Sequence, residues 1–305
     1  MSEAPDLITL GETMLSLVAA DGTIDDATSF RPTYAGAESN ACVAAVRAGV
    51  RAAWVSRLGA DPTGDRIIAA LEAVGIDVRW VRRDPDRPTG LMIRDTHGGV
   101  RYWRHGSAAS ALEPSDLDGV PIAVAEAVLV TGITALLGDG PQRTAVVFLD
   151  RATGIRAVDP HVRPGLWGSD RSAELLGSLL ERCDVLLAGE GELARLLGTS
   201  DLGEALARRA QLLGPAEVIL KRGSEGAAVL MPDGGWLELR PPPVVEVDPV
   251  GAGDAFNGAY LAARIRGADV PDALAAGCAS GAMVAGTMGD TEPSAASGDR
   301  SVLFE

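Results

Sequence analysis

The sequence has 305 residues, of which 47% are hydrophobic, and its formal net charge is −15. This length and composition predict one large α/β domain, or a domain with a small appendage, and we expect neither nucleic acid nor membrane as a partner because so acidic a chain repels phosphates and anionic lipid. The three cysteines are far apart, and residues 1–12 have no basic region typical of a signal peptide, so we expect a cytoplasmic protein with reduced thiols.

Short apolar runs alternate with helical patterns along most of the chain. The first run, residues 7–10, ends at Gly11 and predicts a buried strand. This alternation predicts βαβ units in a mostly parallel sheet with helices on both faces. The other expected strands are 53–58, 127–130, 155–158, 184–188 and 218–221, and the expected helices are 66–74, 141–151, 171–182, 192–197, 203–213, 254–266 and 272–284.

Two segments interrupt this alternation. Residues 14–34 and 89–103 contain short alternating strands joined by turns such as DGT and HGG. We expect them to form a small β-sheet that stands off the main part of a single domain, residues 1–305, and covers a site. A hairpin at the edge of the main sheet is the alternative.

The most informative motif is DPVGAGDAFNGAY, residues 248–260. Gly251, Ala252 and Gly253 precede a helix-compatible stretch that starts at Asp254. Small residues allow close backbone approach, and a helix N-terminus presents unpaired N–H groups, so the segment predicts an anion-binding site. Asp254 at its mouth could accept a proton from an incoming hydroxyl, although a helix N-cap would also explain an Asp there.

This segment resembles the C-terminal signature of the ribokinase-like (PfkB) carbohydrate kinases. AGAESN at 35–40, RLGADPTGD at 57–65 and ILKRGSEGA at 219–227 resemble other segments of that family. The resemblance implies a Rossmann-like, mostly parallel sheet sandwiched by helices, with a small β-sheet lid. It also implies phosphorylation of a sugar hydroxyl with ATP and Mg²⁺. It leaves open a requirement for a monovalent cation and a homodimer formed through the lid.

Within the family, the chain resembles 2-keto-3-deoxygluconate kinases at 102–114, 130–137 and 163–167. This likeness implies that Arg104 and Arg163 contact the carboxylate of the sugar, as guanidinium groups do bidentately. Met92 stands where the subgroup has Tyr, and Gly189 replaces the Asn of an N-x-x-E motif whose Glu192 is kept. Fructose, a nucleoside or another sugar remains an alternative substrate, and a catalytically silent sugar sensor is an alternative of another class.

Most of the expected site residues follow from the same resemblance, whereas Glu12 is expected because it directly follows the first strand, at the edge where α/β proteins bind ligands, and Asp290 is expected to face the site. Catalysis is expected from Asp254 with Gly251, Ala252 and Gly253, and Glu192 is expected to act on Mg²⁺ through water. The expected sugar contacts are Glu12, Gly36, Asn40, Met92, Tyr102, Arg104, Arg163, Asp254 and Asp290, and the expected nucleotide contacts are Lys221, Gly223, Gly226, Gly251 and Gly253.

Three weaker signals complete the sequence analysis. Lys221 is the only lysine among 27 basic residues, and a surface lysine at a strand end is its alternative role. The three histidines have no metal-like spacing, and only His105, beside Arg104, is expected near the sugar. A dinucleotide oxidoreductase is disfavoured because Gly11-Glu12 after the first strand does not form GxGxxG.

Overall fold

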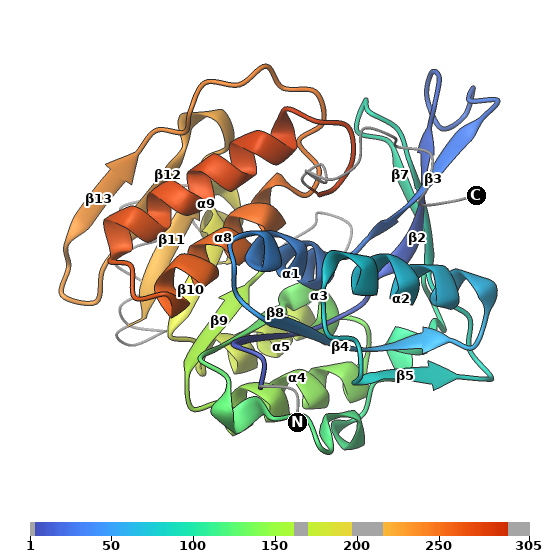
Figure 1. Ribbon diagram of the computed structural model, residues 1–305, viewed down its shortest axis with the longest axis horizontal. Helices are drawn as coiled ribbons and strands as arrows, with labels where there is room; N and C mark the ends of the chain where they lie inside the picture. Colours follow the sequence, from blue (N-terminus) through green and yellow to red (C-terminus); the bar gives the residue numbers. More distant parts are fainter. Residues whose placement is uncertain (1–3, 162–169, 197–215, 292–305) are drawn as a thin grey trace.

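The computed structural model describes residues 4–161, 170–196 and 216–291. A nine-stranded sheet runs through the molecule (Figure 1). Its strands from β11 to β5 are parallel, and β12 and β13 extend one edge in antiparallel pairing, so the predicted mostly parallel sheet is confirmed. The order is β13 (Trp236–Leu239), β12 (Ala227–Leu230), β11 (Glu217–Lys221), β10 (Val185–Gly189), β9 (Ile155–Asp159), β8 (Ala127–Thr131), β1 (Leu7–Leu10), β4 (Ala52–Gly59) and β5 (Val81–Asp84).

Helices cover both faces of this sheet because its strands are apolar on both sides. Along β1, Leu7 packs in one core cluster, and Ile8 and Leu10 pack in the other. The first cluster lies under α1 (Ala37–Arg47), α2 (Pro62–Val74), α8 (Ala252–Ile265) and α9 (Val270–Ala285); the second lies under α3 (Gly132–Ala135), α4 (Asp139–Arg151), α5 (Asp170–Leu180) and α6 (Glu190–Leu196). The sandwich predicted from the sequence is therefore confirmed.

Most predicted elements match within a few residues, and α2 differs most clearly. The sequence predicted a helix at 66–74 after a loop, but α2 begins at Pro62. The side chain of Asp61 caps it by accepting a hydrogen bond from the Gly64 N–H at 2.8 Å, and proline suits the first helical position. The helix predicted at 203–213 lies outside the described residues.

The two interrupting segments form one four-stranded sheet, the lid. Its order is β3 (Phe30–Ala35), β2 (Met14–Ala19), β6 (Leu91–Arg94) and β7 (Val100–Trp103). Parallel pairing of β2 with β6 joins the segments. Figure 1 shows this sheet standing off the main one, as predicted, so the edge-hairpin alternative is wrong.

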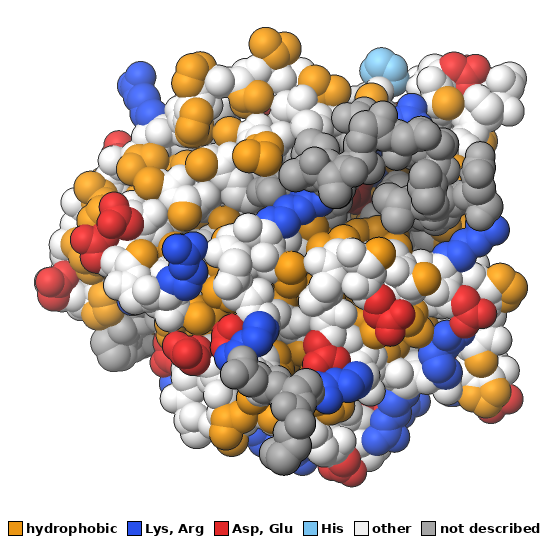
Figure 2. Space-filling view, in the orientation of Figure 1, with side chains coloured by type: hydrophobic (Ala, Val, Ile, Leu, Met, Phe, Trp, Pro, Cys, Tyr) orange, Lys and Arg blue, Asp and Glu red, His pale blue; other side chains and the backbone are white. Residues whose placement is uncertain are grey.

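Two surface properties bear on partners. Within residues 4–161, 170–196 and 216–291, the helices are too short or too polar for a membrane span. On the face in Figure 2, Lys and Arg side chains are interspersed with Asp and Glu, so positive charge does not form a continuous surface there.

Candidate active site

A cleft of about 460 Å³ lies between the lid and the carboxyl ends of the parallel strands. The lid contributes residues such as Met92 and Tyr102 to its lining, and the strand ends contribute residues such as Asp159 and Lys221. Open α/β sheets bind ligands at this edge, where helix N-termini also converge. The cleft is therefore the candidate active site.

The segment before α8 shapes one wall of the cleft. Gly251, the N-cap of α8, has φ +83°, and a Cβ there would lie 2.0 Å from the backbone oxygen of Asp290. Only glycine tolerates both the left-handed backbone and the close contact. Ala252 and Gly253 open the helix. The Ala252 N–H donates to the Pro249 carbonyl at 3.2 Å, and the N–H groups that follow it in the first turn lack intrahelical partners. This wall can bind an anion such as a phosphate.

Asp254 is held at the mouth of this wall. Its side chain lies in the first turn of α8 and the residue is 8% exposed. One carboxylate oxygen, Oδ2, accepts a hydrogen bond from Asn40 Nδ2 at 3.0 Å, and Oδ1 lies 3.5 Å from His161 Nε2. The N-cap of α8 is Gly251, so the capping explanation of Asp254 is wrong. The expectation that His161 has no place near the site is also wrong.

Lys221 belongs to a buried polar cluster in the cleft. Its side chain is 16% exposed, and Nζ lies 2.7 Å from Asp159 Oδ2. Asn257 donates to the same oxygen at 2.7 Å and accepts from Lys221 at 3.2 Å. Burial lowers the pKa of Lys221, but the charges of Asp159 and Glu192 outweigh it, so the pKa is raised. The surface-lysine alternative is therefore wrong.

Glu12 and Arg104 form an ion pair in the lining of the cleft. Glu12 is 4% exposed; its Oε1 accepts a hydrogen bond from Ser107 Oγ at 2.5 Å, and its Oε2 lies 2.5 Å from Arg104 Nη2. The Arg104 guanidinium also lies 5.7 Å from the centre of the Tyr102 ring.

Gly36 is required at the start of α1, since a Cβ would lie 2.4 Å from Thr13 Oγ1.

Some expected residues lie elsewhere. Gly223 and Gly226 form the turn between β11 and β12 and do not line the cleft. Arg163 lies outside the described residues.

Glu192 lines the cleft, and its Oε2 accepts a hydrogen bond from the Gly189 N–H at 2.8 Å. The described part of the chain holds no cluster of three or more His, Cys, Asp or Glu residues that could hold a metal ion.

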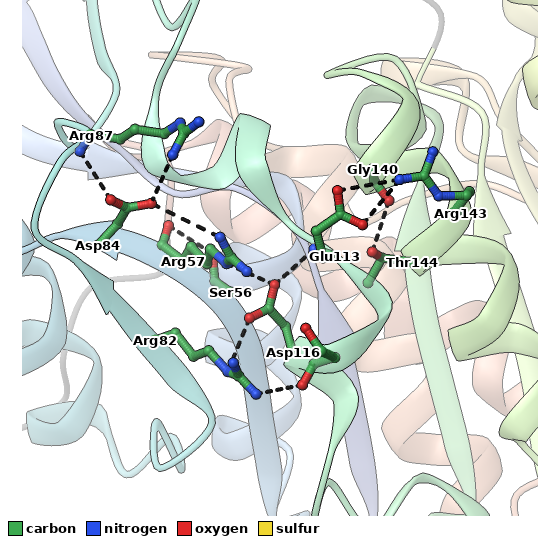
Figure 3. A network of polar contacts seen from close by, with 11 residues as sticks. Ser56, Arg57, Arg82, Asp84, Arg87, Glu113, Asp116, Gly140, Arg143 and Thr144 are labelled. Carbon is green, nitrogen blue, oxygen red and sulfur yellow. Dashed lines mark hydrogen bonds and ion pairs between the residues drawn. The ribbon is translucent and has the colours of Figure 1, made fainter.

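A second cavity of about 650 Å³ adjoins the cleft, and Arg104 lines both. His105, expected near the sugar, lines this second cavity only. Two further arginines in its lining face carboxylates (Figure 3). Arg57 Nε lies 2.7 Å from the buried Asp116, and an Arg87 nitrogen lies 3.6 Å from an oxygen of Asp84. Because these charges are already paired, the second cavity offers little free positive charge.

Several polar residues around the cleft were missed by sequence reasoning, among them Asp159, Asp248 and Arg94. Asp159 ends an apolar run, and the carboxyl end of a predicted parallel strand was the signal that could have identified it. Asp248 lies inside the recognised motif but was given no role. Arg94 carried no signal, because arginine is so frequent in this chain. It pairs with Asp248 and Asp290, so Asp290 does lie at the cleft, as expected, but as a buried ion-pair partner.

The comparisons with known proteins agree with this geometry. A model of the pfkB family carbohydrate kinases matches residues 4–296. The 2-dehydro-3-deoxygluconokinase of Thermoproteus tenax is 36% identical over 295 residues, covering 94% of this chain and 90% of that protein. The 2-dehydro-3-deoxygalactonokinase of Haloferax volcanii is 34% identical over 300 residues, covering 93% and 92%. A ribokinase II from E. coli, solved with ATP and Mg²⁺, superposes with a TM-score of 0.87 at 27% identity, over 94% of both chains. The chain therefore belongs to the pfkB family and is an ATP-dependent carbohydrate kinase.

Proposed function

We propose that this kinase phosphorylates the 6-hydroxyl of 2-keto-3-deoxygluconate or of a closely related 2-dehydro-3-deoxy sugar acid. The observation that carries the proposal is the 36% identity, over 94% of the chain, to a kinase named for this acid. The 2-dehydro-3-deoxygalactonokinase at 34% identity supports the same chemical class and leaves the sugar's stereochemistry open.

The charge distribution supports an acidic substrate. A chain with net charge −15 repels anions, and salt screens charges beyond about 10 Å at 0.1 M, so binding an anion requires cations in contact with it. Arg104 lines the cleft, and its Nε is buried without a hydrogen-bond partner among the described residues. Glu12 orients this guanidinium and leaves that nitrogen available for a carboxylate. Arg163 is proposed as a second contact.

We assign the proton transfer to Asp254. Its carboxylate is held by Asn40 at the mouth of the α8 N-terminus, where it can accept the proton of the sugar hydroxyl. ATP bound in the cleft would supply the transferred phosphoryl group. The N–H groups of Gly251 and Gly253 would bind the charge that develops on the phosphoryl oxygens, and the Ala252 N–H, which donates to the Pro249 carbonyl at 3.2 Å, would join them by exchanging that partner. Lys221, held by Asp159, is proposed to add a positive charge near Gly253. A Cβ added to Gly253 would lie 3.5 Å from Lys221 Nζ.

The residues present suit a magnesium ion that keeps most of its waters. Glu192 is a carboxylate in the cleft, and Mg²⁺ binds through few carboxylates together with water and phosphate. We propose that Glu192 holds such a water, and that Gly223 and Gly226 lie near the adenine end of the nucleotide.

Two other predictions from the sequence stay predictions. The edge strand β7 of the lid exposes Val100, Tyr102 and Trp103, which supports a homodimer formed through the lid. A cytoplasmic location also stays a prediction. The catalytically silent sensor is not supported, since the chain is a kinase by family and Asp254 and Lys221 are both in place in the cleft.

A substrate panel tests the proposal. We expect kcat/KM for 2-keto-3-deoxygluconate or its galactonate isomer to exceed the values for fructose, ribose and a nucleoside. Arg104→Met should lower the acid values by about ten- to a hundredfold, since a charge-assisted hydrogen bond contributes about 1.5–3 kcal/mol. Arg101→Met is the matched control, because Arg101 is an exposed lid arginine paired with Asp25. A wild-type preference for fructose, or equal losses for acidic and neutral sugars, would reject the acid-sugar proposal and leave the kinase assignment intact.

A further inference from the structure

One buried arginine joins the lid to the segments around the α8 N-terminus. Arg94 is the last residue of β6, and its side chain is 3% exposed. Its Nη2 lies 2.9 Å from Asp248 Oδ2 and 2.5 Å from Asp290 Oδ1, whose side chains are 1% and 2% exposed. A single nitrogen therefore sits between two carboxylates that are almost completely removed from water.

Both carboxylates belong to segments that shape the anion-binding wall. Asp248 Oδ1 accepts a hydrogen bond at 3.2 Å from the N–H of Val250, the residue directly before the αL glycine Gly251. Asp290 lies against that glycine, since a Cβ on Gly251 would be 2.0 Å from the Asp290 backbone oxygen. A movement of either carboxylate would therefore shift the N–H groups that begin α8.

This arrangement needs a positive charge. Two neighbouring carboxylates cannot both stay ionised in a buried site unless a cation compensates them. Burial raises the pKa of Asp290 to about 6 although Arg94 lowers it, and the charges of Asp248 and Asp254 raise it further. Without Arg94, the pair would have to take up a proton or bind a cation from solution, and carboxylate oxygens are ligands that alkali metal ions accept.

We propose that Arg94 is a built-in cation: its guanidinium takes the place that a monovalent metal ion would fill behind the anion-binding wall, so the enzyme requires neither K⁺ nor Na⁺. Arg94 acts as a positioning residue that holds the lid and the start of α8 together. The monovalent cation that the family resemblance left open does not fit these residues, because Nη2 already contacts both carboxylates. The proposal is independent of which sugar is phosphorylated.

The test compares K⁺, Na⁺ and tetramethylammonium chloride at equal ionic strength, in wild type, Arg94→Ala, Arg94→Lys and the lid control Arg101→Ala. Initial rates and melting temperatures are both measured, and the melting temperatures need no substrate. Wild type and Arg101→Ala should show the same rate and melting temperature in all three salts. Arg94→Ala should lose about tenfold or more of its rate in tetramethylammonium, as expected when two buried carboxylates lose their partner, and K⁺ should restore part of the rate and raise the melting temperature. Arg94→Lys, which keeps a charge, should remain independent of K⁺.

Activation of wild type by K⁺ by about tenfold would overturn the proposal whatever the variants do. A rate for Arg94→Ala equal to wild type in tetramethylammonium would also overturn it. If Arg94→Ala does not fold, Arg94→Lys decides with wild type: salt-independent rates in both support the proposal, and K⁺ dependence in either contradicts it. If wild type phosphorylates neutral sugars but not acidic ones, the proposed substrate is wrong. The melting temperatures, which need no substrate, still test the role of Arg94.

Discussion

Replacing Lys221 with Met would remove a buried charge while nearly keeping the shape of the side chain. In the wild type, Lys221 Nζ lies 2.7 Å from Asp159 Oδ2, and Asp159 is 1% exposed. After the substitution, water could not solvate the Asp159 carboxylate. Its remaining partners would be the Asn257 amide at 2.7 Å and the backbone N–H of His161 at 2.9 Å.

The magnitude follows from this geometry. Removing one partner of a buried ion pair costs about 3–5 kcal/mol, and the two hydrogen bonds that Asp159 keeps favour the lower end, about 3 kcal/mol. A chain of this size should then melt about 6–12 °C lower. Burial raises the pKa of Asp159, but the positive charge and hydrogen bond of Lys221 outweigh this effect and hold the pKa below its usual value. The pair therefore stabilises wild type above about pH 4 and loses this effect as the pH falls through the lowered pKa, so the deficit of Lys221→Met should shrink in acid.

Urea unfolding of wild type, Lys221→Met, Asp159→Asn and the double variant measures the coupling directly. The double variant should be more stable than Lys221→Met, because it no longer buries an unpaired charge. Lys221→Arg is the control that keeps the charge. If Lys221→Met lies within about 1 kcal/mol of wild type, or if the double variant is no more stable than Lys221→Met, the buried-pair reasoning is wrong.

The remaining predictions concern the wall around α8. Asp254→Asn should lower kcat by about 10²–10⁴-fold because the proton acceptor is lost, while nucleotide affinity measured by calorimetry stays close to wild type; a variant with more than half the wild-type kcat would exclude Asp254 as the base. Gly251→Ala should cost roughly 1–3 kcal/mol of stability in chemical denaturation, because its φ of +83° strains an alanine and the new Cβ meets Asp290; unchanged stability would contradict this. The pKa of Asp290 is raised to about 6 in the folded protein. As the pH rises from 4 to 6, the free energy of unfolding of wild type should therefore fall by up to about 3 kcal/mol through this group. The stability of Asp290→Asn relative to wild type should therefore increase over that window, and a difference that is constant with pH would refute the shift.

The local elements were largely predictable from the sequence. The apolar run 7–10 predicted β1 with its observed bounds, since a strand buried on both faces is encoded by consecutive apolar residues. The glycine-rich segment before Asp254 predicted the start of α8 within two residues. The start of α2 was missed, because a cap made by Asp61 and Pro62 looks like loop sequence until the helix after it is seen.

The sequence by itself determined the fold class, the family and most of the polar side chains that line the cleft, because these depend on local periodicity and on contiguous motifs. Only the tertiary structure decided which members touch. Asn40 and Asp254 are 214 residues apart and share a hydrogen bond, and Arg94 is 196 residues from Asp290. Such pairs form where the lid, the strand ends and the first turn of α8 meet. Burial there makes each charge depend on one specific partner, and no spacing along the chain records that dependence.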